Sequence, residues 1–190
     1  MGGGYLADAG VFLVQVIFGF AVVLFLVRVL LQLVRANFFN PVCQFIVKVT
    51  NPVLMPLKKI IPSWGRLDIG AVIFAWLLQV TELALTLGMR GISIAIPTLL
   101  AYSFVELIDL TIVIFMFVIF VKIILSWVAP YNDNPIQPVL YQLSEPVLAP
   151  CRRILPPMAG LDLSPMLALV ALQLTRILLV NPLSDLARAI

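Results

Sequence analysis

The stretch Pro52-Val-Leu-Met-Pro56-Leu-Lys58-Lys59-Ile-Ile-Pro62 decides the fold, because it occurs twice in the chain. It returns at an offset of 94 residues, from 52 to 146, as Pro146-Val-Leu-Ala-Pro150-Cys-Arg152-Arg153-Ile-Leu-Pro156. Three prolines and a basic pair in one register are improbable by chance in an apolar chain. They therefore indicate an internal repeat.

The same register continues on both sides of the motif without a gap. Asn40-Pro41 matches Asn134-Pro135, and Asp68 matches Asp162. Within the apolar stretches, Arg28 matches Lys122, and Gln79 and Thr81 match Gln173 and Thr175. We predict two copies of one unit, covering residues 1–94 and 95–190.

The composition around the repeats is that of a membrane protein. Hydrophobic residues make up 63% of the 190 residues and charged residues only 11%. A helix needs roughly 18 apolar residues or more to cross a hydrocarbon core about 30 Å thick. Four stretches are long enough, and they lack the alternating pattern of a barrel wall. We predict an all-α membrane protein whose spans cover residues 11–34, 69–87, 104–128 and 163–180.

Each unit contains two spans, so both copies enter the membrane from the same side and the repeats are parallel. Parallel repeats disfavour a carrier built from inverted repeats. The segment between the two spans of a unit, here called its hairpin, carries most of the Lys and Arg near span ends. Because positively charged short loops are retained inside, we expect cytoplasmic hairpins and both termini outside.

Each hairpin is expected to contain two short helices. In the first copy Val42, Phe45, Ile46 and Val49 follow helical spacing on one face, and the second copy repeats the pattern. Asn40 and Asn134 are N-cap candidates, each followed by a proline at the first helical position, Pro41 or Pro135. Second helices are expected to start at Pro52 and Pro146 and to bend or end at Pro56 and Pro150. The hairpins either lie in the membrane interface or re-enter the membrane.

The basic pairs have two readings. Lys58, Lys59, Arg152 and Arg153 either set topology alone or contact anionic lipid headgroups or an acidic partner. The net charge of +3 is too sparsely distributed to indicate nucleic acid. The expected partners are a lipid bilayer with anionic headgroups and either a membrane protein or further copies of this chain. Structural roles are assigned to the repeated residues Asn40, Pro41, Pro52, Pro56, Pro62, Asp68, Asn134, Pro135, Pro146, Pro150, Pro156 and Asp162.

Charged residues within spans are functional candidates. Glu82 and Arg176 occupy equivalent positions in the two units with opposite signs, which suggests an ion pair across the pseudo-twofold axis. Alternatively, each side chain snorkels to the outer headgroups. Glu106 and Asp109 begin the third predicted span, where they either interact with the helix dipole, the preferred reading, or bind a cation or proton. Gln79, Thr81, Gln173 and Thr175 either bond between helices or line a polar path.

No reaction chemistry is recognisable in the sequence. Histidine is absent, which excludes histidine-ligated haem or zinc within this chain alone. The two cysteines, Cys43 and Cys151, are not at equivalent positions. No nucleophile with a base, metal cluster or phosphate loop is evident. We therefore expect no enzyme activity and no cofactor.

The doubled unit resembles the YggT family. The resemblance rests on Asn-Pro, then Pro-Val-Leu-x-Pro-x-basic-basic-Ile-x-Pro, then Leu-Asp before an apolar span, and it covers nearly the whole chain. The first copy departs from the usual Pro-Pro-x-x-Gly with Pro62-Ser-Trp-Gly-Arg66. The resemblance implies a bacterial inner-membrane location and carries no catalytic residues. Plastid relatives are associated with cytochrome assembly, and bacterial relatives with envelope integrity, osmotic tolerance and division.

Two function hypotheses follow. The first is an assembly or scaffold factor whose hairpins contact lipid and a partner. The alternative is an ion pathway or regulator of ion uptake in osmotic tolerance, in which the polar residues of the second and fourth spans take part. An intramembrane arginine would oppose simple cation conduction.

Overall fold

The computed structural model describes residues 3–61, 67–128, 134–155 and 162–189, and its elements are all helices. The first repeat contains α1 (Gly3–Leu33), α2 (Pro41–Ile60) and α3 (Ile69–Met89). The second contains α4 (Ile96–Val128), α5 (Ile136–Ile154) and a last span. That span, here called the C-terminal span, joins α6 (Ser164–Thr175), the π-helix η1 (Arg176–Val180) and α7 (Asn181–Arg188).

Four of these helices are long and apolar enough to cross a membrane, which confirms the predicted fold class. α1, α4 and the C-terminal span are each several residues longer than the apolar stretches suggested, and α1 begins at Gly3 rather than near 11. α4 begins at Ile96 rather than near 104, with Pro97 in its first turn, where a missing N–H costs nothing. The C-terminal span continues past 180 to Arg188, although it contains Pro182.

The π-helix lies directly before Pro182. A proline inside a regular α-helix clashes with the carbonyl four residues earlier. Here the backbone N–H of Asn181 reaches the carbonyl of Arg176, five residues back, so the turn is wider than an α-helical turn. The widened turn accompanies the proline without ending the span.

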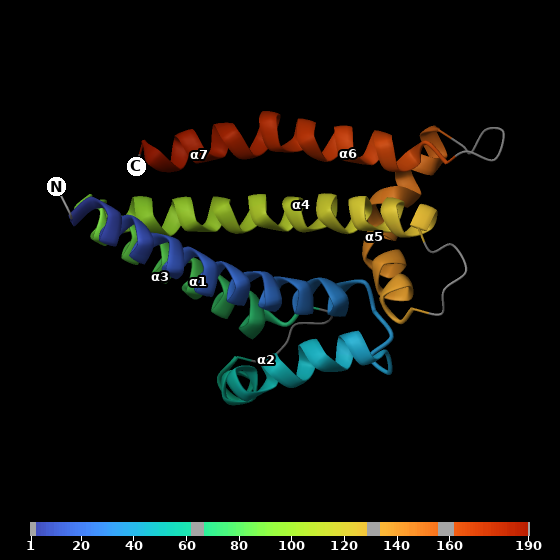
Figure 1. Ribbon diagram of the computed structural model, residues 1–190, viewed down its shortest axis with the longest axis horizontal. Helices are drawn as coiled ribbons and strands as arrows, with labels where there is room; N and C mark the ends of the chain where they lie inside the picture. Colours follow the sequence, from blue (N-terminus) through green and yellow to red (C-terminus); the bar gives the residue numbers. More distant parts are fainter. Residues whose placement is uncertain (1–2, 62–66, 129–133, 156–161, 190) are drawn as a thin grey trace.

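The spans lie in a row in which α4 is placed between α3 and the C-terminal span. α1 packs along α3, α3 packs on α4, and α4 packs on the C-terminal span, whereas α3 and the C-terminal span make no contact in the described residues. Figure 1 shows both termini at one end of the spans and α5 crossing the row at the other end, next to α2. The two units therefore run in the same direction, as predicted for parallel repeats.

In the described residues each hairpin contains one helix, so the prediction of two short helices was wrong. Pro52 and Pro56 lie inside α2, and Pro146 and Pro150 lie inside α5. Each proline leaves the carbonyl four residues earlier without its helical donor, and none of the residues that carry these carbonyls is buried. α2 bends instead of ending, and its last turns are seen nearly end-on in Figure 1.

The buried face of α2 also differs from the predicted one. Cys43, Ile46 and Leu54 are buried against the spans, as is Thr50. Phe45 and Val49, which were expected on the same face as Ile46, are 61% and 45% exposed. α2 therefore carries apolar side chains in two directions, one toward its own spans and one outward.

Leu54 tests how strongly the hairpin is fixed by packing. Its side chain is fully buried, so Leu54→Ala should lower the free energy of unfolding by about 2–5 kcal/mol through lost contacts and a residual cavity. Thermal unfolding of the purified protein in mild detergent measures the loss. Met55→Ala is the matched control, because its neighbouring side chain is 62% exposed. Equal losses in both variants would show that α2 is not packed on the spans as described.

Candidate functional site

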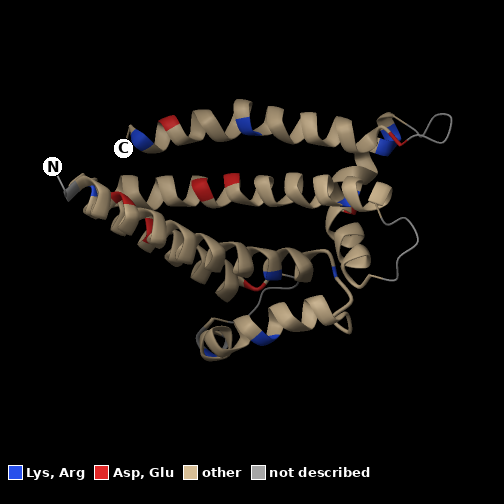
Figure 2. Cartoon of the chain, in the orientation of Figure 1, with Lys and Arg blue, Asp and Glu red and all other residues tan. Residues whose placement is uncertain are grey.

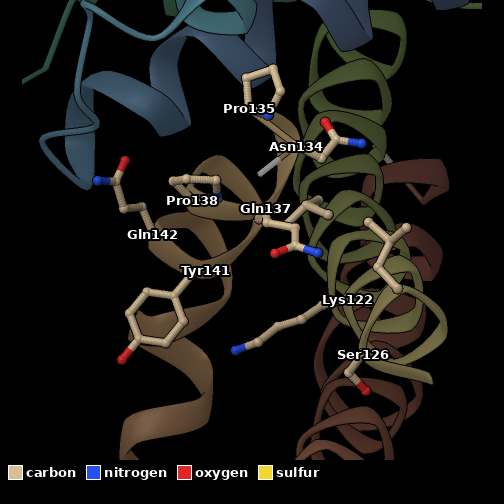
Figure 3. Close-up of a pocket in the computed structure, with 10 residues that line it drawn as sticks. Lys122, Ser126, Asn134, Pro135, Gln137, Pro138, Tyr141 and Gln142 are labelled. Atoms are coloured by element: carbon tan, nitrogen blue, oxygen red, sulfur yellow. The ribbon is translucent and has the colours of Figure 1, made fainter. Parts of the chain in front are cut away.

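Charged side chains gather in two regions, one at the hairpin end of the spans and one in the other half of α4 and the C-terminal span (Figure 2). At the hairpin end, a cavity of about 660 Å³ opens between the end of α4 and the start of α5. Lys122 extends into it from α4 toward Tyr141 on α5 (Figure 3). Both repeats contribute residues to the region at the hairpin end.

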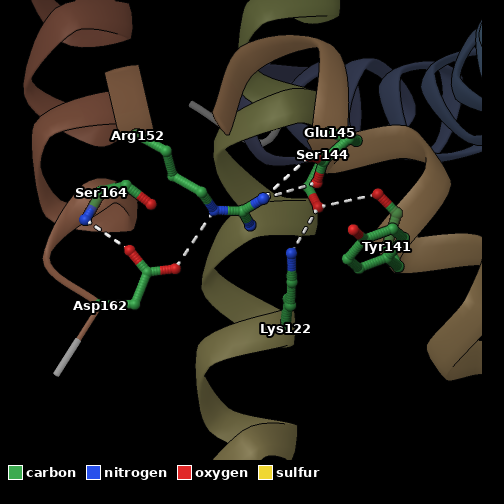
Figure 4. Close-up of polar contacts among 7 residues, drawn as sticks. All are labelled: Lys122, Tyr141, Ser144, Glu145, Arg152, Asp162 and Ser164. Atoms are coloured by element: carbon green, nitrogen blue, oxygen red, sulfur yellow. Dashed lines mark hydrogen bonds and ion pairs between the residues drawn. The ribbon is translucent and has the colours of Figure 1, made fainter. Parts of the chain in front are cut away.

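In each repeat a basic residue of the first span donates to a hydroxyl of the hairpin helix. Arg28 of α1 donates to Thr50 Oγ1 and to the carbonyl of Val47, the latter at 3.2 Å. At the equivalent position, Lys122 of α4 donates to Ser144 Oγ at 3.1 Å (Figure 4). Both hydroxyls also donate back to a carbonyl of their own helix, Thr50 to Ile46 and Ser144 to Tyr141. A cation within the span thus holds each hairpin helix in place.

The repeated aspartates begin the second span of each unit. Asp68 Oδ1 accepts from the backbone N–H of Ala71, and Asp162 Oδ1 accepts from the backbone N–H of Ser164 at 2.9 Å. Partial burial alone would raise the pKa of the Asp162 carboxyl. Hydrogen bonds from Ser164 and Arg152 outweigh that effect and lower the pKa. Both aspartates therefore serve the structural role that the repeat suggested.

Asn40 is the N-cap of α2, as predicted, whereas Asn134 lies one residue before the N-cap of α5, which is Pro135 and not the first helical residue as expected. Asn40 Oδ1 accepts from the backbone N–H of Val42 at 2.9 Å, and Asn134 Oδ1 accepts from that of Ile136 at 3.0 Å. Asn40 Nδ2 also donates to the carbonyl of Pro135, which ties the starts of the two hairpin helices together. Sequence reasoning did not find this second bond, because it depends on how the repeats pack. Pro62 and Pro156 lie outside the described residues.

The four cations proposed as lipid or partner contacts are not equivalent. Arg152 forms an ion pair with Glu145 at 2.8 Å and contacts Asp162 at 3.4 Å, so it links α5 to the start of the C-terminal span (Figure 4). Lys59 and Arg153 are exposed. The side chain of Lys58 lies outside the described part. At the position where the second repeat carries Glu145, the first repeat carries the uncharged Asn51.

The predicted pairing of Glu82 with Arg176 is wrong. Arg176 instead makes a bidentate ion pair with Asp109 of α4, at 2.6 and 2.8 Å. The cause is the order of the spans: α4 lies between α3, which carries Glu82, and the C-terminal span. The carboxylate that faces Arg176 therefore comes from α4.

Glu106 and Asp109 do not sit at a helix start, so the preferred dipole reading is also wrong. α4 begins at Ile96, which places both carboxylates several turns inside the helix. Glu106 accepts from Gln79 Nε2 of α3 at 3.0 Å, a bond between helices as suggested for Gln79. The early Pro97 was the available signal for the true start. Thr81 and Thr175 donate within their own helices, to Leu77 and Ala171.

A polar cavity of about 410 Å³ adjoins the Asp109–Arg176 pair, beside the π-helix. Its mixture of carboxylates and guanidiniums would suit water or a polar solute more than a lone cation. Arg188 donates to the Tyr102 hydroxyl at 2.9 Å across this region. The lining residues are Tyr102, Glu106, Asp109, Arg176, Val180, Asn181, Ser184, Asp185 and Arg188.

The described residues contain no group of three or more histidines, cysteines or carboxylates positioned to hold a metal ion. Both cysteines are buried, and burial raises the pKa of the Cys43 thiol, which disfavours the reactive thiolate. The arrangement is therefore better suited to holding helices and contacting charged groups than to nucleophilic chemistry.

Comparison with known proteins gives a consistent set of matches. The CCB3/YggT family model matches residues 7–89 and again residues 101–183. An uncharacterized protein of Pseudomonas aeruginosa is 39% identical over 181 residues, covering 94% of this chain and 92% of its own length. Uncharacterized protein YggT of Escherichia coli is 32% identical over 161 residues, covering 85% of this chain and 84% of its own. No solved structure matches the chain.

The Asp109–Arg176 pair predicts a specific rescue. Asp109→Arg or Arg176→Asp alone places like charges together inside a span, which should cost about 3–5 kcal/mol and lower the amount of folded protein. The double swap, Asp109→Arg with Arg176→Asp, should recover most of the lost folded protein. Folded yield by fluorescence-detected gel filtration measures both effects. A double swap of Glu82→Arg with Arg176→Asp is the control and should show no rescue; recovery there would contradict the assignment.

Proposed function

We propose that this chain, which belongs to the CCB3/YggT family, is a non-enzymatic accessory protein of the bacterial inner membrane that assembles or scaffolds membrane complexes. Its hairpins would lie on the cytoplasmic side and both termini outside, in agreement with the distribution of Lys and Arg. The hairpin helices would contact anionic lipid headgroups and the membrane-proximal part of a partner, either another membrane protein or a further copy.

The outward face of α2 carries this proposal. Phe45, Val49 and Val53 are spaced by four residues along one stripe and are 61%, 45% and 37% exposed. Lys48 and Lys59 are exposed on the same helix. A helix that packs one face on its own spans and presents a second apolar face beside lysines is suited to the membrane interface or to a partner helix.

α5 does not offer an equivalent face. Val139 and Leu143, which correspond to Phe45 and Val49, are buried, and α5 contacts α1 and α2 of the first repeat. Its Arg152 is engaged by Glu145 and Asp162. The second hairpin therefore supports the first, and α2 is the surface assigned to partner contact.

The alternative function is an ion pathway or a regulator of ion uptake in osmotic tolerance. The polar cavity beside Asp109 and Arg176 favours it, because ionisable residues inside a span often mark ion or substrate pathways. The ion pair works against cation conduction, since an arginine in the path repels cations.

The scaffold proposal predicts loss of a partner when the basic end of α2 is neutralised. Tagged protein is crosslinked in intact cells, purified in mild detergent and analysed for stoichiometric companions. Lys58→Gln with Lys59→Gln should reduce the companion about fivefold or more, as expected when a few favourable contacts are lost. Arg153→Gln is the matched control, because it removes an exposed cation from the second hairpin.

A companion retained equally in all variants would remove the basic end of α2 from the proposal. Absence of any companion, with ion flux through protein-containing liposomes that is lost in Glu106→Gln, would replace the scaffold with the ion pathway.

A further inference from the structure

The cavity between α4 and α5 offers a defined site for the lipid contact proposed above for the hairpin helices, and its assignment rests on that proposal. It measures about 660 Å³ and lies where α4 ends and α5 begins. Figure 3 shows Lys122 and the amide of Gln137 pointing into the same space, with Asn134 and Pro135 at one side and Tyr141 at another. Leu125, Pro138 and Leu140 supply apolar wall. The cavity thus combines one cation with hydroxyl and amide groups and an apolar lining.

The cation in this cavity has no carboxylate of its own among the described residues. The Lys122 ammonium donates to Ser144 Oγ at 3.1 Å and lies 4.7 Å from the centre of the Tyr141 ring. The nearby carboxylates, Glu145 and Asp162, are paired with Arg152 (Figure 4). An ammonium has three N–H donors, so Lys122 can still donate to an anion in the cavity.

The equivalent place in the first repeat is filled. There Arg28 and Leu31, which correspond to Lys122 and Leu125, are buried, and so is Cys43, which corresponds to Gln137. The helix α5 of the second repeat packs on α1 and α2. Among the described residues no further helix covers α4 and α5 in the same way, so the second repeat keeps an open cavity and a half-buried cation.

The position of the cavity identifies the class of ligand. It lies at the hairpin end of the spans, beside Trp127, which is 81% exposed near the end of α4. Exposed tryptophans near span ends are typical of the headgroup level of a bilayer. An anion available at that level that also fits an apolar wall is an amphiphilic phosphate.

We propose that this cavity binds the phosphate-bearing headgroup of an anionic glycerophospholipid. The Lys122 ammonium contacts the phosphate, and Leu125 and Pro138 contact the apolar part of the lipid. The site is separate from the outward stripe of α2 and belongs to the second repeat alone. The shared chemistry is that of a phosphate, which a membrane lipid or free phosphate could supply.

Native mass spectrometry of the full chain in neutral detergent tests the proposal. Phosphatidylglycerol, phosphatidylcholine and inorganic phosphate are titrated separately. Wild-type protein should retain phosphatidylglycerol more strongly than phosphatidylcholine, and Lys122→Gln should weaken that retention about tenfold through loss of one charged hydrogen bond. Lys122→Arg, which keeps the positive charge, should keep most of the phosphatidylglycerol retention. Leu125→Trp, which fills the cavity and keeps the cation, should weaken it as well.

Arg90→Gln is the matched control, because it removes an exposed cation at the end of α3, away from the hairpins, and should leave retention unchanged. Melting without lipid shows that each variant is folded before its binding is compared. Unchanged binding in folded Lys122→Gln and Leu125→Trp, or loss in Arg90→Gln alone, would overturn the site. Equal binding of inorganic phosphate would overturn the assignment to lipid.

Discussion

Each hairpin depends on one contact between a cation of the preceding span and a hydroxyl of the hairpin helix, buried in the first repeat and half-buried in the second. A cation inside a span is costly unless it finds acceptors. Arg28, only 6% exposed, finds Thr50 and the carbonyl of Val47, and Lys122 finds Ser144. Thr50 and Ser144 precede Pro52 and Pro146 by two residues, where the helix must tolerate a missing backbone donor. The contact thus fixes the hairpin where its own backbone is weakest.

Much of the architecture could be predicted because its signals are local or repeated. The two units, the four spans and the cap at Asn40 follow from register, hydropathy and capping chemistry. The partner of Arg176 could not be predicted, because it depends on the order in which the spans pack. The start of α4 was placed too late because Thr98, Tyr102 and Ser103 interrupt the apolar run, although Ser103 is buried and bonded to Trp76.

The two repeats acquire different surfaces because their neighbours differ. The second unit packs on the first, which buries Val139 and Leu143 of α5 and leaves Phe45 and Val49 of α2 outward. At the position of Asn51 the second unit carries Glu145, which pairs with Arg152. The second hairpin helix thereby serves packing within the chain, whereas part of the first faces outward.

The π-helix sets the rotational phase of the C-terminal span. In a uniform α-helix, residue 187 would lie on the order of 100° around the axis from residue 168, because each residue advances about 100°. The wider turn takes up one extra residue and removes most of that rotation. Ala168 can therefore pack near Ile119 of α4 while Val180 and Ala187 pack near Val105 and Ile112. A one-residue deletion within Arg176–Val180 would turn the last two turns of the chain away from α4, whereas the same deletion beyond Arg188 would leave that seam in phase.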